Sequence, residues 1–122
     1  MTRTVVLVDD EDDIREIAAL ALSLAGWEVV PLSSGTAAVD VVADLLPDAV
    51  LLDVMMPGQD GPATLALLRR DPRTAGVPIV FLTAKAQARE RQELEGMGAA
   101  GVIVKPFDPM LLGTQLAALL GW

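Results

Sequence analysis

The feature that most constrains the fold of this 122-residue chain is the alternation of five short apolar runs with five helical patterns. Short apolar runs bounded by Gly, Pro, Asp or Ser are typical of buried strands. The predicted strands are Val5–Val8, Glu28–Leu32, Ala49–Leu52, Ile79–Leu82 and Val102–Val104. The predicted helices are Asp12–Ala25, Gly35–Leu46, Pro62–Arg70, Ala86–Met97 and Pro109–Leu120. This order predicts an α/β fold with a parallel sheet and right-handed crossovers.

Residues with strong positional preferences lie at the predicted helix ends. Gly26 follows the first helix, and Ser33 and Ser34 are candidate caps for the second. Asp60 is placed to cap the third helix, with Pro62 in its first turn. Ser and Asp side chains accept hydrogen bonds from free N–H groups at helix starts, and Gly favours helix ends. These residues therefore agree with the predicted boundaries.

Length and composition exclude several classes of protein. One domain, residues 1–122, is expected from the length, with no output domain after the last helix at Trp122. No apolar run approaches the roughly 18 residues of a membrane span, and a strand begins too early to leave room for a signal peptide. Cysteine is absent, which favours a cytoplasmic location. The net charge of −8 and the scattered basic residues predict no nucleic-acid partner.

Carboxylates follow two of the predicted strands. Asp9, Asp10 and Glu11 come after the first strand, and Asp53 ends the third. Because the carboxyl ends of parallel strands meet at one edge of a sheet, these groups are expected to lie close together. The chain has no histidine, so a metal ion here would be held by oxygen atoms, which favours Mg²⁺ or Mn²⁺.

Two further strand ends complete the candidate site. Thr83 follows the fourth strand, and Lys105 follows the fifth. Acids for a metal, a hydroxyl, an ammonium and a free carboxylate suit phosphoryl transfer to Asp53 as the nucleophile. Each residue alone also has an ordinary structural explanation, since acids and Thr often cap helices and Lys-Pro often forms a turn. Their placement at four matching strand ends favours the functional interpretation.

On these residues the chain resembles a response-regulator receiver domain of two-component signalling, similar to chemotaxis regulators. The resemblance covers essentially the whole chain, and the residues that carry it are Val8-Asp9-Asp10-Glu11, Leu52-Asp53-Val54-Met55-Met56-Pro57-Gly58, Asp60-Gly61, Leu82-Thr83-Ala84-Lys85 and Lys105-Pro106-Phe107. It implies a flavodoxin-like, doubly wound sheet of order 2-1-3-4-5 with helices on both faces. It also implies a phosphorelay protein that is not an enzyme, beyond self-phosphorylation from small donors and autodephosphorylation.

The resemblance assigns a role to each site residue. Asp53 would accept a phosphoryl group from a histidine kinase or a histidine phosphotransfer protein and thereby switch binding to a downstream protein. Asp10, Asp53 and the Met55 backbone carbonyl would bind Mg²⁺, with Asp9 acting through water. The residues that would contact the phosphoryl group are Thr83, Ala84 and Lys105, and the Lys105–Pro106 peptide bond would be cis.

One position departs from the family pattern. An aromatic residue usually stands three positions before the lysine, where it is paired with the threonine as a switch. Here that position is Val102, and the chain contains no Tyr. The aromatic half of the switch is therefore missing from this chain.

Two other families share part of this pattern. Haloacid dehalogenase-like phosphatases also place an Asp nucleophile at a strand end, but they need a second acid two residues later, where this chain has Met55. A flavin carrier of similar fold needs a phosphate-binding loop after the first strand, where Asp9, Asp10 and Glu11 would repel phosphate.

The first and last helices carry more apolar residues than one buried face requires. The predicted core stripes are Ile14, Ala18, Ala21 and Ala25, and Leu112, Leu116 and Leu119. Four residues lie off these stripes: Leu20, Leu24, Leu111 and Trp122. They belong either to a wide buried face or to a contact surface for a partner or a homodimer. The fourth helix is polar on nearly all sides, which favours a solvated helix.

Overall fold

The computed structural model describes residues 2–84 and 87–122, and it contains the ten predicted elements in the predicted order. The elements are β1 (Thr4–Val8), α1 (Asp12–Leu24), β2 (Glu28–Leu32), α2 (Gly35–Leu45), β3 (Ala49–Asp53), α3 (Gly61–Arg70), β4 (Ile79–Thr83), α4 (Ala88–Gly96), β5 (Gly101–Val104) and α5 (Pro109–Leu120). The third and fourth strands extend one residue beyond their predicted ends. Asp53 and Thr83 are therefore strand residues whose positions the sheet fixes.

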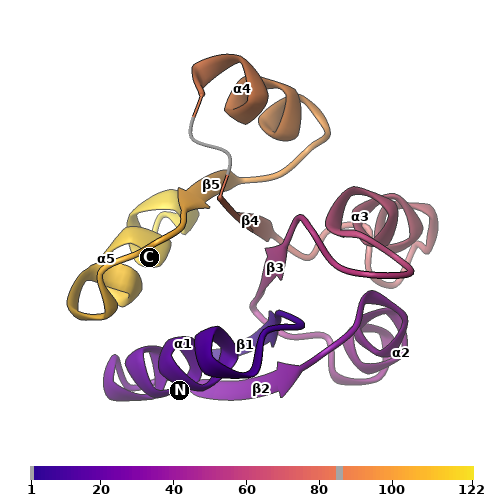
Figure 1. Ribbon diagram of the computed structural model, residues 1–122. Coiled ribbons are helices and arrows are strands. Elements are labelled where there is room, and N and C mark those ends of the chain that lie inside the picture. The colour runs from indigo at the N-terminus through magenta and orange to yellow at the C-terminus, as the bar shows by residue number, and fades with distance from the viewer. Residues whose placement is uncertain (1, 85–86) are drawn as a thin grey trace.

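All five strands pair in parallel in the order β2-β1-β3-β4-β5, which confirms the expected topology. Figure 1 shows α1 and α5 on one face of the sheet and α2 and α3 on the other, with α4 beyond the β4–β5 edge. The order of the sheet reverses between β1 and β3, where chain connections leave toward opposite faces. A crevice at the carboxyl ends of these strands is the usual ligand site of such sheets.

Two buried clusters fill the space between the sheet and its helices. One cluster joins alternate residues of the central strands to α1 and α5, and the other joins the remaining residues to α2, α3 and Leu94 of α4. The central strand β3 is buried along its whole length because helices cover both of its faces. This packing holds the carboxyl ends of the strands in fixed relative positions.

The helix ends follow the predicted signals in most places. Ser34 accepts the N–H of Ala37, and Asp60 accepts the N–H of Ala63. Gly26 has a φ of 95°, a left-handed conformation that favours glycine. The predicted start of the fourth helix, Ala86, lies outside the described residues, and the described helix begins at Ala88.

The predicted core stripes of α1 and α5 are partly wrong. Ala18 of α1 is buried, but its partner in the core is Leu22, which the prediction omitted, and Ala25 is exposed beyond the helix end. Leu112 and Leu116 of α5 are buried as predicted. Leu119 is more than a third exposed because it lies over the glycine that begins β5, at the sheet edge.

The four residues off the predicted stripes have different environments. Leu20, Leu24 and Leu111 are exposed, so a wide buried face is wrong for them. Trp122 is half-buried: its ring meets that of Trp27 edge-on at a centroid distance of 5.1 Å, and the Arg3 guanidinium lies 4.2 Å from its centroid. No helix among the described residues is long and apolar enough to cross a membrane.

Gly61 lets α3 begin directly against the end of β3. Its N–H donates to the Val54 carbonyl at 3.0 Å, and a Cβ at this position would lie 2.5 Å from the Asp53 carbonyl oxygen. Both neighbours are backbone, so neither can move without shifting the strand that carries Asp53.

Gly61→Ala is therefore expected to destabilise the protein by about 1–3 kcal/mol, because the added methyl overpacks this contact. Gly96→Ala is the matched control, since no atom of residues 2–84 and 87–122 lies within 4 Å of a Cβ there and Ala favours a helix. Urea unfolding of both variants measures the effect. Equal stabilities would show that the β3–α3 contact does not depend on glycine.

Candidate functional site

Asp9 and Asp10 lie at the end of β1, where the chain turns into α1. Asp9 is buried and Asp10 is half-buried. Asp9 Oδ1 accepts the N–H of Glu11 at 2.9 Å, and the Asp9 N–H donates to the Leu32 carbonyl of β2. Glu11, the cap residue of α1, makes no side-chain cap hydrogen bond. Helix capping therefore does not explain this acidic cluster.

Asp53 ends β3 and is only 2% exposed. The chain leaves the strand through Val54, whose N–H donates to the Leu82 carbonyl of β4 at 3.1 Å. Gly58 then adopts a φ of 77°, which turns the loop toward α3. Met55, two residues after Asp53, is exposed in this loop.

The ends of β4 and β5 bring Thr83 and Lys105 to the same edge. Thr83 is buried at the end of β4, its carbonyl accepts the Lys105 N–H at 2.7 Å, and Ala84 next to it is exposed. The Lys105–Pro106 peptide bond is cis, which confirms that prediction. The structure thus places Asp9, Asp10, Asp53, Thr83 and Lys105 at the carboxyl edge of the sheet.

Lys105 connects the two acidic strand ends. Its Nζ lies 2.9 Å from Asp9 Oδ2, 3.2 Å from Asp53 Oδ1 and 3.9 Å from Glu11 Oε1. The lysine side chain is 10% exposed, so these charges interact largely out of water. One ammonium from β5 therefore links β1 to β3 by ion pairs.

The three aspartates could also hold a cation. One carboxylate oxygen from each of Asp9, Asp10 and Asp53 lies within 4.8 Å of the others. Asp53 Oδ2 is buried, and no hydrogen-bond partner for it exists among the described residues. A buried acceptor without a partner is costly, so this oxygen is available to a ligand. The oxygen-only donor set fits a hard divalent ion such as Mg²⁺.

The site holds more negative charge than its lysine neutralises. Burial, followed by the nearby charge of Asp9, raises the pKa of Asp53 to about 6, despite the opposing effect of Lys105. Burial acts to lower the pKa of Lys105, but its hydrogen bond to Asp9 and the charges of Asp53 and Asp9 outweigh burial and raise it. The lysine therefore stays charged, and the carboxylates gain from any further cation.

Sequence analysis missed one contact of this site. Arg15 donates from its guanidinium to the Asp9 carbonyl oxygen at 2.8 Å, which ties α1 to the end of β1. The position of Arg15 in the sequence could have indicated this contact. It lies early in α1, where the helix dipole favours acidic residues, so a basic residue there suggests a specific partner. Glu11 was assigned no separate role, although its carboxylate reaches Lys105.

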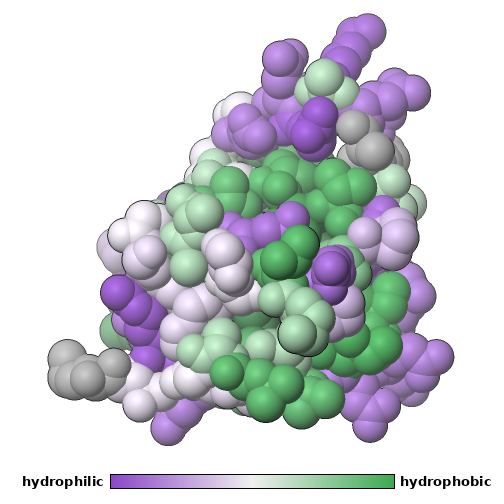
Figure 2. All heavy atoms as spheres, turned by 90° about the vertical axis from the view of Figure 1, so that its left-hand side faces the viewer, coloured by the Kyte–Doolittle hydropathy of each residue, from purple (hydrophilic) through white to green (hydrophobic). Residues whose placement is uncertain are grey.

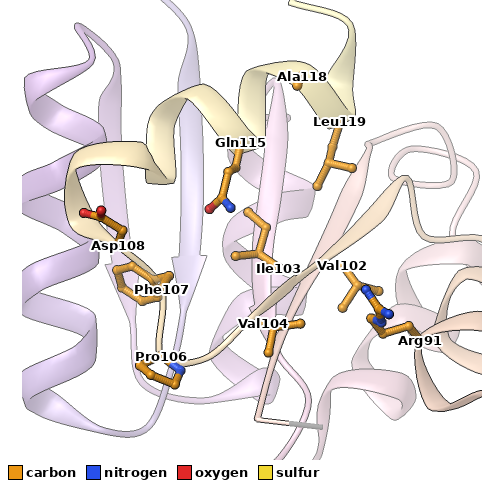
Figure 3. Close-up of a pocket in the computed structure, with 10 residues that line it drawn as sticks. All are labelled: Arg91, Val102, Ile103, Val104, Pro106, Phe107, Asp108, Gln115, Ala118 and Leu119. Atoms are coloured by element: carbon orange, nitrogen blue, oxygen red, sulfur yellow. The ribbon is translucent and has the colours of Figure 1, made fainter. Parts of the chain in front are cut away.

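Val102, which replaces the expected aromatic residue, borders an open hollow of about 440 Å³ between β5, α4 and α5. Figure 3 shows its lining, which includes Arg91 of α4, Val102 and Val104 of β5, and Leu119 of α5. Val102 is itself half-buried. Within the described residues, the valine thus leaves open space between the fifth strand and its flanking helices.

Comparison with known proteins gives a consistent result. The model of the response regulator receiver domain family matches residues 5–117. The phosphate regulon transcriptional regulatory protein PhoB of Pseudomonas aeruginosa is 41% identical over 120 residues, which are 97% of this chain and 52% of PhoB. The structure of the Vibrio cholerae chemotaxis response regulator CheY4 aligns with a TM-score of 0.91 at 30% identity, over 98% of this chain and 99% of CheY4.

A third similar structure concerns the metal. It is the receiver domain of the Pseudomonas aeruginosa sensor histidine kinase PA1611, described with a magnesium ion coordinated in its active site cleft. It aligns with a TM-score of 0.88 at 26% identity and covers all of both chains. This chain spans about half the length of the curated relatives it matches. The match over residues 5–117 decides against the phosphatase and flavin-carrier alternatives.

The raised pKa of Asp53 predicts a pH dependence of stability in metal-free buffer. A raised acid pKa means that the folded state disfavours the charged form, so the contribution of Asp53 to stability is fully present below about pH 4 and is lost as the pH rises through 6. Asp53→Asn removes this loss. Above pH 7 it should raise the free energy of unfolding by on the order of 2–3 kcal/mol, with little effect at pH 4.

Denaturant unfolding at pH 4, 6 and 8 in EDTA measures this difference. Asp40→Asn, on the exposed side of α2, is the control for a change in net charge alone. A constant difference between Asp53→Asn and wild type across these pH values would contradict the pKa shift.

Proposed function

Since this chain belongs to the response regulator receiver domain family, the phosphoacceptor modules of two-component signalling, we propose that Asp53 is its phosphoacceptor. The observation that carries the proposal is the buried Asp53 Oδ2, which lacks a partner among the described residues while Oδ1 faces the Lys105 ammonium. One oxygen is thus held by a cation, and the other is available to form a bond. One carboxylate oxygen of Asp9 and one of Asp10 lie within 4.8 Å of an Asp53 oxygen.

The proposed reaction transfers a phosphoryl group between two proteins. Asp53 Oδ2 forms a bond to phosphorus while the bond from phosphorus to the donor nitrogen breaks, and the departing imidazole keeps that electron pair and takes a proton. The proposed donor is a phosphohistidine of a histidine kinase or phosphotransfer protein, and it must lie on another protein because this chain contains no histidine. A pKa of about 6 leaves most Asp53 ionised at pH 7 and therefore nucleophilic.

Lys105 and Thr83 have supporting roles in this proposal. The Lys105 ammonium is already 3.2 Å from Asp53. After phosphorylation it would pair with a phosphoryl oxygen in place of the carboxylate oxygen. The buried Thr83 hydroxyl and the Ala84 backbone would donate to the other phosphoryl oxygens. Their place at the end of the neighbouring strand, opposite Lys105, supports this assignment.

A divalent ion fits the acidic cluster beside Asp53. Asp10, Asp53 and the Met55 carbonyl would hold Mg²⁺ or Mn²⁺ directly, with Asp9 acting through water. The three grouped carboxylates and the orphaned Asp53 oxygen support this, and the PA1611 receiver domain has a magnesium ion in its cleft. When bound, the ion supplies positive charge for the phosphoryl oxygens.

The chain acts as a signalling domain rather than as a general enzyme, as receiver domains do. Self-phosphorylation from small donors and slow loss of the phosphoryl group are the activities that we propose for Asp53 itself. Receiver domains interact with histidine kinases or phosphotransfer proteins. Several relatives are DNA-binding regulators, so the absence of a nucleic-acid partner stays a prediction.

Incubation with acetyl phosphate and Mg²⁺ should add one phosphoryl group to the wild-type chain, measured by intact-mass spectrometry. Asp53→Asn should remove this addition, because the amide is a far weaker nucleophile. Asp40→Asn keeps the site and should be labelled like wild type. Labelling of Asp53→Asn at the wild-type level would assign the phosphoryl group to another residue.

Millimolar Mg²⁺ should raise the melting temperature, because the ion binds the assembled carboxylates and not the unfolded chain. Asp10→Asn should reduce this increase by more than half, since it removes one ligand, and should also raise the stability of the metal-free protein by relieving repulsion. Differential scanning fluorimetry with MgCl₂ against matched NaCl measures both effects. Equal increases in Asp10→Asn and wild type would exclude Asp10 as a ligand.

A further inference from the structure

Helix α1 carries a row of large apolar side chains that no other part of the described chain covers. Ile17, Leu20 and Leu24 are 48%, 63% and 79% exposed. Their spacing of three and four residues places them on one side of the helix, while Ala18 and Leu22 face the sheet. Figure 2 shows this side of the molecule, where hydrophobic residues gather over α1, well below the hydrophilic helix α4.

The neighbouring helix α5 extends this apolar surface without covering it. A Cβ on Gly113 would lie 3.0 Å from the Ala25 Cβ, so small residues bring the two helices close together. Above this contact a shallow hollow of about 240 Å³ separates Leu24 from Met110, which is 87% exposed. We define the α1 face as Ile17, Leu20, Leu24 and Met110.

Two residues predicted to lie on the contact surface do not belong to the α1 face. Leu111 is four and seven residues before Gln115 and Ala118, which line the hollow beside β5, so it lies on that side of α5. Trp122 is half-buried against Trp27. The structure therefore replaces them with Ile17 and Met110.

The spacing of the α1 face fits a second copy of the same face in antiparallel orientation. If a two-fold axis passes between residues 20 and 21, Ile17 of one copy lies beside Leu24 of the other, and Leu20 lies near the axis. Together with Asp13, the positions 13, 17, 20 and 24 are separated by four, three and four residues, the spacing of helices that pack side by side. A two-fold contact requires such a self-complementary surface.

Charges at the two ends of the face also favour this orientation. The start of α1 carries Asp12, Asp13 and Glu16, which are exposed. At the opposite end the exposed Arg3 lies over Trp122, which contacts Trp27 just after α1. Antiparallel pairing brings Asp13 of one copy toward Arg3 and the neighbouring exposed Glu28 of the other, whereas parallel pairing would bring the two acidic starts of α1 together.

The exposed area of the α1 face indicates how strongly two copies should associate. The four side chains of the α1 face expose on the order of 500 Å² in each copy, so a pair would bury about 1,000 Å² of them, at the low end for specific contacts. We propose that this face is the interface of a weak, antiparallel homodimer in which α1 packs against α1. One end of this interface approaches the Asp53 site, since Ile17 and Lys105 line the same hollow of about 160 Å³.

Sedimentation equilibrium of the wild-type chain should show a monomer–dimer equilibrium with a dissociation constant of roughly 10 μM to 1 mM. Leu20→Glu combined with Leu24→Glu should raise that constant at least about 30-fold, as expected for central contact residues. Both residues are exposed, so the variant should keep the wild-type circular dichroism spectrum. Leu111→Glu is the matched control and should dimerise like wild type.

A cysteine test locates the two-fold axis. The chain has no cysteine, so Leu20→Cys can form a disulfide only between copies. Near the axis the two Cα atoms come close enough to bond, and mild oxidation should give a dimer on a non-reducing gel. Leu111→Cys should stay monomeric under the same conditions.

A charge exchange tests the orientation. Asp13→Arg should weaken the dimer several-fold, and adding Arg3→Asp should restore it, because the exchanged charges again face each other. A wild-type chain that stays monomeric at millimolar concentration would overturn the proposal. Dimerisation lost in Leu111→Glu, a Leu20→Cys chain that does not cross-link, or a charge exchange without rescue would equally overturn it.

Discussion

The structure depends on the ion pairs that the Lys105 ammonium makes with Asp9 and Asp53. Lys105 and Asp9 directly follow β5 and β1, and Asp53 ends β3, so a single cation joins strand ends that would otherwise bring buried negative charges together. The compensation is incomplete, because burial and the charge of Asp9 still raise the pKa of Asp53 to about 6. A divalent ion would complete the balance of charge at this edge, and it would also offset the negative charge that a phosphoryl group adds.

The fold follows from the sequence because the apolar runs, the helical spacing and the capping residues all favour the same elements. The five apolar runs became five parallel strands, and Ser34 and Asp60 cap the helices that they precede. The strand order could not be derived from the runs, since alternating strands and helices allow several orders, and it came from the family resemblance. The site was predicted residue by residue, because residues at the carboxyl ends of parallel strands must converge whatever the order of the central strands.

What the sequence did not predict depends on how helices are rotated and where they end. Helical spacing identified Ala18 but not Leu22 as core, since a stripe one residue wide is narrower than the face that a helix buries. Leu119 lies at the sheet edge, where burial is incomplete. Trp122 contacts Trp27 and Arg3 because the fold brings the end of the chain next to its beginning. The hollow beside Val102 likewise required the positions of α4 and α5. Such features arise from tertiary packing, which periodicity along one element does not describe.

The central claim is that Asp53 is a buried, charge-coupled carboxylate prepared to bind a cation and accept a phosphoryl group. The most direct test is an NMR titration of the Asp53 side-chain carboxyl carbon, with and without Mg²⁺, assigned by comparison with Asp53→Asn. The account predicts a pKa near 6 in metal-free buffer and a clear decrease when Mg²⁺ is added, because a bound cation favours the carboxylate. An Asp53 carboxyl that titrates near 4 in both conditions would contradict the account.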